Sequence, residues 1–161
     1  MPATATRCRL ALLPRHVQAV KRHAAGAYPE ECCGFLLGAE DGDGGVLVER
    51  VLPARNEHPE DPRRRFLIAP ETVLAARREA RGLGLEIVGY YHSHPDRPAE
   101  PSEHDLADAW PNASYLIVPV ADGVAGEVRS WRLRGDGGGF EEEDVEAAGR
   151  PAVARHGRRG R

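Results

Sequence analysis

Hydrophobic positions along the chain follow two patterns: continuous apolar runs, and apolar residues with helical spacing. Two stretches with helical spacing begin at a proline, a residue favoured in the first turn of a helix. They predict helices over residues 14–25 and 70–81, each followed by a glycine that ends it. A shorter helix is predicted over residues 102–110.

Apolar runs bounded by glycine, proline and acidic residues predict strands. The glycine- and aspartate-rich segment 41–45 predicts a hairpin turn, and the polar segment 56–64 predicts a surface loop of the kind that often borders a site. Strands and helices in mixed order predict one α/β domain with a mixed sheet flanked by helices. The predicted strands span residues 7–13, 33–38, 46–52, 66–69, 86–93, 114–120 and 124–134, and residues 140–148 form a last strand or a frayed helix.

Length and composition agree with one folded domain. The 161 residues, 41% of them hydrophobic, can bury a core, and the domain is expected to span residues 1–149. No apolar stretch reaches the length of about 18 residues that a membrane span needs, and the run at 10–13 is interrupted by Pro14. We therefore predict a cytoplasmic protein that does not bind a membrane.

The net charge of -3 hides a difference between the body and the end of the chain. Residues 150–161 contain five arginines and no acid, so residues 1–149 carry 17 basic against 25 acidic groups, a charge of -8. An acidic body argues against nucleic acid as a partner. The composition of residues 150–161 predicts a disordered tail.

The cysteines do not form a recognisable disulfide or zinc pattern. There are three, Cys8, Cys32 and Cys33, and the adjacent pair is poorly placed to close on itself. None has the paired CxxC spacing of a cysteine zinc site. We expect these thiols to be small buried apolar groups in a reducing compartment.

The segment His92-Ser93-His94 carries the strongest chemical signal. Alternate side chains of a strand share a face, so His92 and His94 point the same way and Ser93 points to the other side. A proline-rich turn can bring Asp105 back over the strand as a third ligand. Two imidazoles and one carboxylate leave the fourth position of a zinc ion open for water, which is the catalytic pattern.

A structural explanation exists for Ser102 and Asp105. Ser-x-x-Asp at a helix start is close to a capping box, and this role is compatible with a metal site at the same place. The other five histidines have no comparable sequence context, and we expect them at the surface: His16, His23, His58, His104 and His156.

These residues resemble the JAMM (MPN-plus) metalloprotease motif, Glu…His-Ser/Thr-His-Pro-x(6)-Ser-x-x-Asp. The match is His92-Ser93-His94-Pro95, Ser102 and Asp105. The segment 29–38, Pro-Glu-Glu-Cys-Cys-Gly-Phe-Leu-Leu-Gly, resembles the upstream part of its bacterial and archaeal members, and the resemblance covers about residues 7–145.

The resemblance implies a cytidine-deaminase-like JAMM/MPN architecture and a set of roles. Glu31 becomes the catalytic glutamate, preferred over Glu30 because it stands two residues before Cys33-Gly34. His92, His94 and Asp105 become the ligands of Zn²⁺. With zinc-activated water, Glu31 transfers a proton to the departing amine and Ser102 donates to the oxyanion.

The implied reaction is hydrolysis of an amide bond at the Gly-Gly C-terminus of a ubiquitin-like or sulfur-carrier protein. Releasing cysteine from a carrier–cysteine adduct, as compact bacterial relatives do, is one example. Alternatives are a catalytically inactive MPN-type scaffold, and a binding module that uses the arginine-rich tail. A nucleoside deaminase is disfavoured because its His-x-Glu and Pro-Cys-x-x-Cys signatures are missing.

Overall fold

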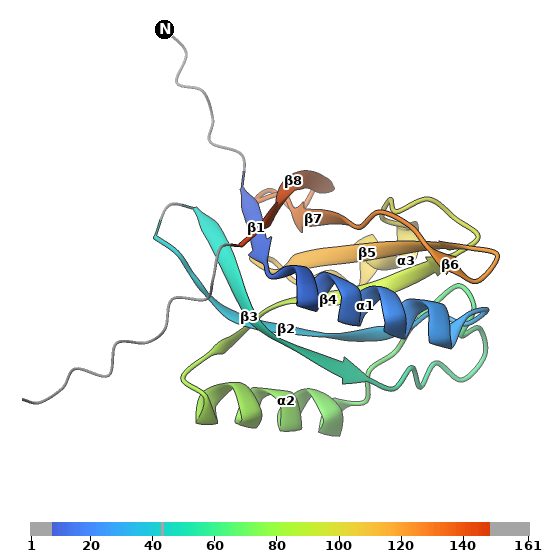
Figure 1. Cartoon of the computed structure of the whole chain (residues 1–161), viewed down its shortest axis with the longest axis horizontal. Helices are drawn as coiled ribbons and strands as arrows, with labels where there is room; N and C mark the ends of the chain where they lie inside the picture. Colours follow the sequence, from blue (N-terminus) through green and yellow to red (C-terminus); the bar gives the residue numbers. More distant parts are fainter. Residues whose placement is uncertain (1–7, 43, 149–161) are drawn as a thin grey trace, which may run out of the picture.

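The computed structural model describes residues 8–42 and 44–148, which form one mixed sheet with three helices (Figure 1). The helices are α1 (Pro14–Ala27), α2 (Pro70–Gly82) and α3 (Glu103–Ala107). The strands are β1 (Arg9–Leu12), β2 (Cys33–Glu40), β3 (Gly45–Ala54), β4 (Glu86–Pro95), β5 (Ser114–Ala121), β6 (Val124–Ala125), β7 (Arg129–Leu133) and β8 (Phe140–Ala147). The predicted α/β class is confirmed, whereas the expected tail at 150–161 lies outside the described residues.

The sheet combines parallel and antiparallel pairs in the order β4-β2-β3-β1-β8-β7-β5-β6. The pairs β1–β3, β1–β8 and β4–β5 are parallel, and the other neighbours are antiparallel. Because β4 pairs with both β2 and β5, the strand order closes on itself. This closure gives β4 a neighbour on each edge, and so it fixes the backbone that carries His92 and His94.

Two apolar clusters lie on opposite faces of β2. Leu36 packs with Val20 and Ala24 of α1, whereas Phe35 and Leu37 pack with α2. Alternate residues of a strand point to opposite faces, which explains why the continuous run in β2 is buried on both sides. Figure 1 shows α1 and α2 on different sides of this part of the sheet.

Residues 66–69 do not form the predicted strand. The backbone N–H of Leu67 donates to Oδ1 of Asn56 at 3.1 Å, and the carbonyl of Leu67 accepts the N–H of Glu57 at 2.8 Å. The backbone of this segment is therefore satisfied by the preceding loop and not by a sheet. Its apolar pattern has another use, since the ring of Phe66 stacks on His92 at 4.7 Å.

The predicted strand 124–134 is broken in two. The N–H of Gly126 donates to the carbonyl of Pro119 at 2.7 Å, and pairing with β5 resumes where Arg129 faces Ile117. A proline has no N–H to offer an antiparallel partner, so Pro119 interrupts this edge of β5.

Two helix ends differ from the sequence prediction, and the alternative left open for the last segment is decided. Helix α1 continues through Gly26 to Ala27, although Gly26 was predicted to end it. The short helix ends at Ala107 and not at residue 110, because the N–H of Trp110 donates to the hydroxyl of Tyr115 at 2.6 Å. The last segment is strand β8, which pairs in parallel with β1. Of the helices in residues 8–42 and 44–148, none has the length and apolar content that crossing a membrane requires.

Candidate metal centre and active site

His92 and His94 lie at the end of β4, with their side chains on the same face. Their Nε2 atoms are 3.1 Å apart, and the two residues are 0% and 2% exposed. Ser93 points the other way, where its hydroxyl accepts the N–H of Cys32 at 2.8 Å. The alternation predicted from the sequence is therefore confirmed.

Asp105 comes to the histidines from the first turn of α3. Its Oδ2 atom lies 3.1 Å from Nε2 of His94 and 3.3 Å from Nε2 of His92. The capping box is also present, since the Ser102 hydroxyl accepts the N–H of Asp105 at 3.1 Å and the N–H of Ser102 donates to Oδ2 at 2.8 Å. One carboxylate therefore belongs to both arrangements.

The spacing of these three atoms fits a tetrahedral metal ion. Bonds of about 2.0–2.1 Å at tetrahedral angles place neighbouring donor atoms about 3.3–3.4 Å apart. The observed separations among His92, His94 and Asp105 are 3.1, 3.1 and 3.3 Å. Two imidazole nitrogens and one carboxylate are also a donor set that zinc accepts.

The orientation of the imidazoles is fixed from outside the cluster. Nδ1–H of His94 donates to the carbonyl of Pro98 at 2.9 Å, and this tautomer leaves Nε2 as a lone-pair donor. His92 is held by stacking on Phe66, and its Nδ1 has no partner within the described part of the chain. Burial lowers the pKa of His92, which favours the neutral, metal-binding form.

Glu31 lies just before β2 and turns its carboxylate toward the same point. One of its oxygens and one nitrogen each of His92 and His94 all lie within 4.8 Å of one another. Glu31 is 2% exposed, whereas Glu30 is on the surface. The preference for Glu31 over Glu30 thus agrees with their positions.

The pKa values of the two carboxyl groups of the cluster, Glu31 and Asp105, are shifted in opposite directions. Burial raises the pKa of Glu31 to about 8, although the positive charge of Arg97 opposes the shift. Burial alone would also raise the pKa of Asp105, but contacts with His92 and His94 and the N–H of Ser102 lower it below its usual range. One group is suited to hold a proton and the other to remain a carboxylate.

A cavity of about 870 Å³ opens beside the cluster. His92 and Asp105 form part of its wall, and apolar side chains of α2 and of the segment after the 56–64 loop form much of the rest. Trp110 stands at this cavity with 65% of its surface exposed. Such a cavity can hold an extended chain next to the candidate metal centre.

Sequence reasoning missed the residues that support the cluster. Asn56 donates to the carbonyls of Glu31, Pro62 and Arg65 at 3.0–3.2 Å, so it organises the loop beside the centre. Arg97 donates to Oε2 of Glu31 at 3.0 Å. The only available signals were their places in a predicted site-bordering loop and within the motif, because neither contact has a characteristic spacing.

The remaining histidines do not join the centre, but they are not all at the surface. His16 is only 7% exposed, and its Nδ1 accepts the N–H of Leu13, which helps to begin α1. His23 is half-buried, with Nδ1 2.7 Å from the hydroxyl of Tyr91. His58 is also half-buried, His104 is exposed, and His156 lies outside the described residues. The expectation for His16 was wrong because amphipathic helices bury polar caps as well as apolar residues.

The three cysteines are free thiols in the described structure. Cys32 and Cys33 are buried, as predicted, and Cys8 is half-buried. Burial raises the pKa of the Cys32 thiol to about 11 and that of Cys33 to about 12. They are therefore protonated packing groups next to Glu31 and poor metal ligands.

The chain is similar in sequence to several known proteins. The chain is 33% identical over 108 residues to a probable TtuB-protein conjugate cleaving protease of Thermus thermophilus, covering 67% of this chain and 68% of that protein. It is 34% identical over 118 residues to a CysO-cysteine peptidase of Mycobacterium bovis, covering 73% and 77%. A tail tip assembly protein K of Escherichia phage N15 is 36% identical over 120 residues, 74% of this chain, but the match spans only 44% of that protein.

The fold is likewise shared with solved structures. The solution structure of a protein from Desulfitobacterium hafniense has a TM-score of 0.75 and 32% identity, and the match covers 86% of this chain and 92% of that one. Residues 13–134, which include every residue of the cluster, match the family model described as prokaryotic homologs of the JAB domain. The chain therefore belongs to the prokaryotic JAB (JAB/MPN) family.

Proposed function

We propose that this protein is a zinc-dependent metallopeptidase. It hydrolyses an amide bond at the Gly-Gly C-terminus of a ubiquitin-like or sulfur-carrier protein. The observation that carries the proposal is the meeting of three donor atoms 3.1–3.3 Å apart beside a buried glutamate. The alternative of an inactive scaffold is disfavoured, because such a protein has no need of a complete centre.

His92, His94 and Asp105 are the proposed metal ligands, and Glu31 is not. The oxygen of Asp105 is within 3.3 Å of both histidine nitrogens, whereas the grouping that includes Glu31 spans up to 4.8 Å. In the proposed arrangement Glu31 contacts the water that the metal would hold, and it does not bind the metal itself. Zinc bound here would supply a Lewis acid that activates water and polarises the substrate carbonyl.

Glu31 is the proposed proton carrier. Its Oε1 atom is buried and has no hydrogen-bond partner in the described residues, so it is available to a water molecule. Burial raises the pKa of Glu31 to about 8 in the metal-free protein, which brings it toward neutral pH. A carboxyl group with a raised pKa is suited to take a proton from water and to give it to the departing amine. Both transfers need only the one side chain.

Ser102 is the proposed oxyanion donor. Its Oγ accepts the N–H of Asp105, and this leaves the hydroxyl hydrogen free to donate elsewhere. A donor in such a position stabilises a developing negative charge by about 3 kcal/mol in comparable enzymes. The capping box would hold the hydroxyl in place while it does so.

The substrate class is proposed from the relatives and from the shape of the site. Two relatives are named for the cleavage of a TtuB-protein conjugate and of CysO-cysteine. A Gly-Gly tail has no side chains and can pass through a narrow approach to the metal. The 870 Å³ cavity then suits the carrier residues that precede the tail.

The test is incubation of zinc-loaded protein with sulfur-carrier proteins that carry an added C-terminal residue, followed by intact-mass measurement. We expect loss of the added residue, no cleavage after chelation, and about one zinc per chain that His92→Ala removes. Bound zinc without cleavage of any carrier would favour the scaffold alternative. We propose residues 1–149 as the catalytic domain, and deletion of residues 150–161 should therefore leave cleavage intact. The cytoplasmic location stays a prediction.

A further inference from the structure

Arg97 lies beside the proposed base. Its Nη2 donates to Oε2 of Glu31 at 3.0 Å, and neither residue lines the cavity that His92 and Asp105 border. The Arg97 side chain is 31% exposed, while that of Glu31 is 1% exposed. Arg97 is thus the positively charged, solvent-reachable neighbour of a buried carboxylate.

The guanidinium of Arg97 has N–H donors that its bond to Glu31 does not use. A guanidinium carries five N–H groups, and Nε of Arg97 is buried without a partner among the residues that the structure describes. One bond to Glu31 leaves the rest of the fork available for another acceptor. A carboxylate is the acceptor that a guanidinium fork fits best.

The loop that carries Arg97 is fixed at several points. Asp96 adopts a left-handed conformation with φ 53°, and its carboxylate accepts the hydroxyl of Tyr28 at 2.7 Å and the N–H of Asp122 at 3.0 Å. Further along, the carbonyl of Ala99 accepts Nε1–H of Trp131 at 2.9 Å. Arg97 is therefore presented by an anchored backbone, which limits the cost of ordering it on binding.

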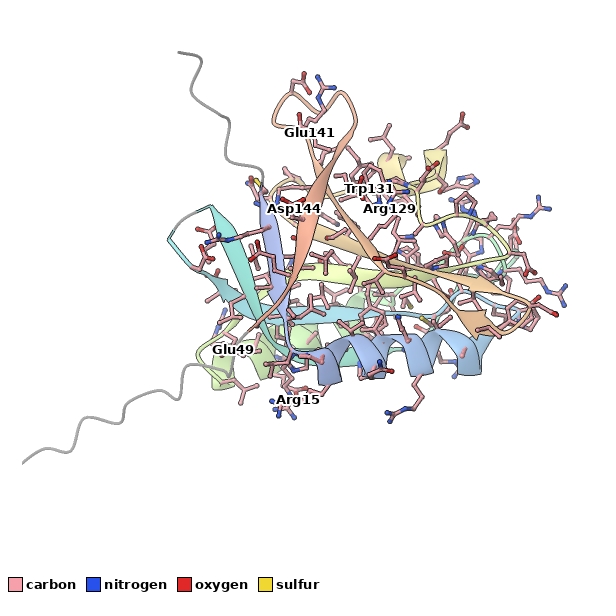
Figure 2. The ribbon with its side chains drawn as sticks, turned by 45° about the horizontal axis from the view of Figure 1, so that its top comes forward. Arg15, Glu49, Arg129, Trp131, Glu141 and Asp144 are labelled. Carbon is pink, nitrogen blue, oxygen red and sulfur yellow. The ribbon has the colours of Figure 1, made fainter. Side chains whose placement is uncertain are left out.

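A second strand residue strengthens this anchor. Arg129 of β7 lies over the ring of Trp131 at 4.8 Å (Figure 2). Its Nη1 also donates to the carboxylate of Glu100 at 3.4 Å. The contact with Glu100 joins β7 to the loop between the histidines and α3, whereas the contact with Trp131 lies within β7 and holds the Arg129 side chain in place. The loop position is thus set by tertiary contacts on both of its sides.

The chemistry of the leaving group places a charge near Arg97. A base that returns its proton to the departing amine must lie within hydrogen-bond distance of that nitrogen. In an α-amino acid, the carbon that bears this nitrogen also bears the carboxylate. In a lysine side chain linked through its ε-amine, no carboxylate is near.

We propose that Arg97 binds the free α-carboxylate of a single amino acid released from the carrier's C-terminal glycine. The preferred substrate is then a carrier–amino acid adduct and not a protein joined through lysine. This inference rests on the proposed function. In the reaction, water adds its hydroxyl to the glycine carbonyl carbon, the C–N bond breaks, and the amine receives the proton from Glu31.

The test compares three forms of one sulfur-carrier protein on zinc-loaded enzyme. In the first form the C-terminal glycine is joined to alanine with a free carboxylate, and in the second to alanine amide. In the third form it is joined through an amide bond to the ε-amine of Nα-acetyl-lysine amide. We expect the wild-type kcat/KM for the acid to exceed that for the amide by about 10- to 100-fold, as for a lost charge-assisted bond. In Arg97→Gln the two values should agree within about twofold, and Arg97→Lys should keep part of the preference.

The acid-to-amide ratio separates carboxylate binding from a role of Arg97 in holding Glu31. Misfolding or a disturbed Glu31 slows both substrates alike and leaves the ratio unchanged. Arg64→Gln is the matched control, since Arg64 is exposed and does not line the cavity, and its ratio should equal that of the wild type.

Three results would overturn the inference while leaving the proposed function standing. They are equal rates on acid and amide in the wild type, a ratio that survives in Arg97→Gln, and faster cleavage of the lysine-linked form. Cleavage of none of the three would instead contradict the proposed function itself, and the inference with it.

Discussion

The backbone N–H of Ser102 donates to Oδ2 of Asp105 at 2.8 Å, and this oxygen is the one that faces the two histidines. In return, the N–H of Asp105 donates to the Ser102 hydroxyl at 3.1 Å. The helix cap and the proposed metal ligand are therefore one side chain. The cap holds the carboxylate at the position where it can bind a metal.

Ser102→Ala should weaken both functions of this pair. Loss of the cap costs about 1 kcal/mol of folding free energy, and loss of the oxyanion donor lowers kcat by about 100- to 1,000-fold. Ser102→Thr keeps the hydroxyl and should retain most of both. If Ser102→Ala lowers zinc affinity but leaves kcat at saturating zinc unchanged, Ser102 is a cap alone.

Glu31→Gln should remove most turnover and leave zinc bound. Glutamine keeps the shape of the side chain but cannot carry a proton, so we expect kcat to fall by about 100-fold or more. Zinc content should remain near one per chain, because the metal ligands are untouched. Glu30→Gln is the control, since Glu30 is exposed, and near-normal turnover in Glu31→Gln would mean that another group is the base.

The stability of the metal-free protein should depend on pH through Glu31. The pKa of Glu31 is about 8 in the folded protein against 4.5 for the exposed group. Between these values the folded state holds a proton that the unfolded state has released, so the contribution of Glu31 to the free energy of unfolding falls as pH rises. Glutamine has no such dependence.

Urea unfolding of wild-type protein and Glu31→Gln, both with chelator, measures this difference. As pH rises from about 5 to about 8, the free energy of unfolding of Glu31→Gln should increase relative to that of the wild type by up to about 1.4 kcal/mol for each pH unit. Titrating groups that do not interact with Glu31 are common to both proteins and cancel in the difference. Parallel stability curves would show that Glu31 ionises normally in the fold.

Trp131→Phe should loosen the loop that orients His94. The substitution removes the bond from Nε1–H to the carbonyl of Ala99, a residue that is 4% exposed. We expect a loss of about 1–3 kcal/mol in the free energy of unfolding and a severalfold weaker zinc affinity, because Pro98 is the neighbouring loop residue. Trp110→Phe, in the cavity wall, is the control and should leave zinc affinity unchanged. Equal zinc affinities for the wild type, Trp131→Phe and Trp110→Phe would show that the contact with β7 does not influence the metal site.

Gly34→Ala should destabilise the sheet next to the centre. A Cβ at Gly34 would overlap the ring of Tyr91, which is fully buried. The Tyr91 hydroxyl is held 2.7 Å from Nδ1 of His23. The ring cannot move freely, so we expect a loss of about 1–3 kcal/mol in the free energy of unfolding.

Gly26→Ala is the matched control for this prediction. Gly26 lies in α1, and a Cβ there meets no atom within 4 Å. Alanine should stabilise the helix by about 0.5–1 kcal/mol. A similar loss of stability in both variants would show that the effect at Gly34 does not come from Tyr91.

Local patterns were sufficient for most elements of the fold. The strand alternation correctly placed His92 and His94 on one face, and Pro14 and Pro70 correctly marked the starts of α1 and α2. Residues 66–69 were misjudged as a strand because their apolar side chains line the cavity and pack on His92. Apolar content reports burial, and burial in a cavity wall looks the same in sequence as burial in a sheet.

The chemical types and the order of the groups could be read from local sequence: two imidazoles on one strand, a helix-capping carboxylate eleven residues after His94, and an upstream glutamate. Local spacing was enough there, because strand alternation and helix capping act over a few residues. The burial of Glu31 beside these groups, and its contact with Arg97 66 positions away, depend on long-range packing and became visible in the three-dimensional structure. Such contacts follow from the pairing of β2 with β4 and from the anchoring of the loop by β7, which no local pattern encodes.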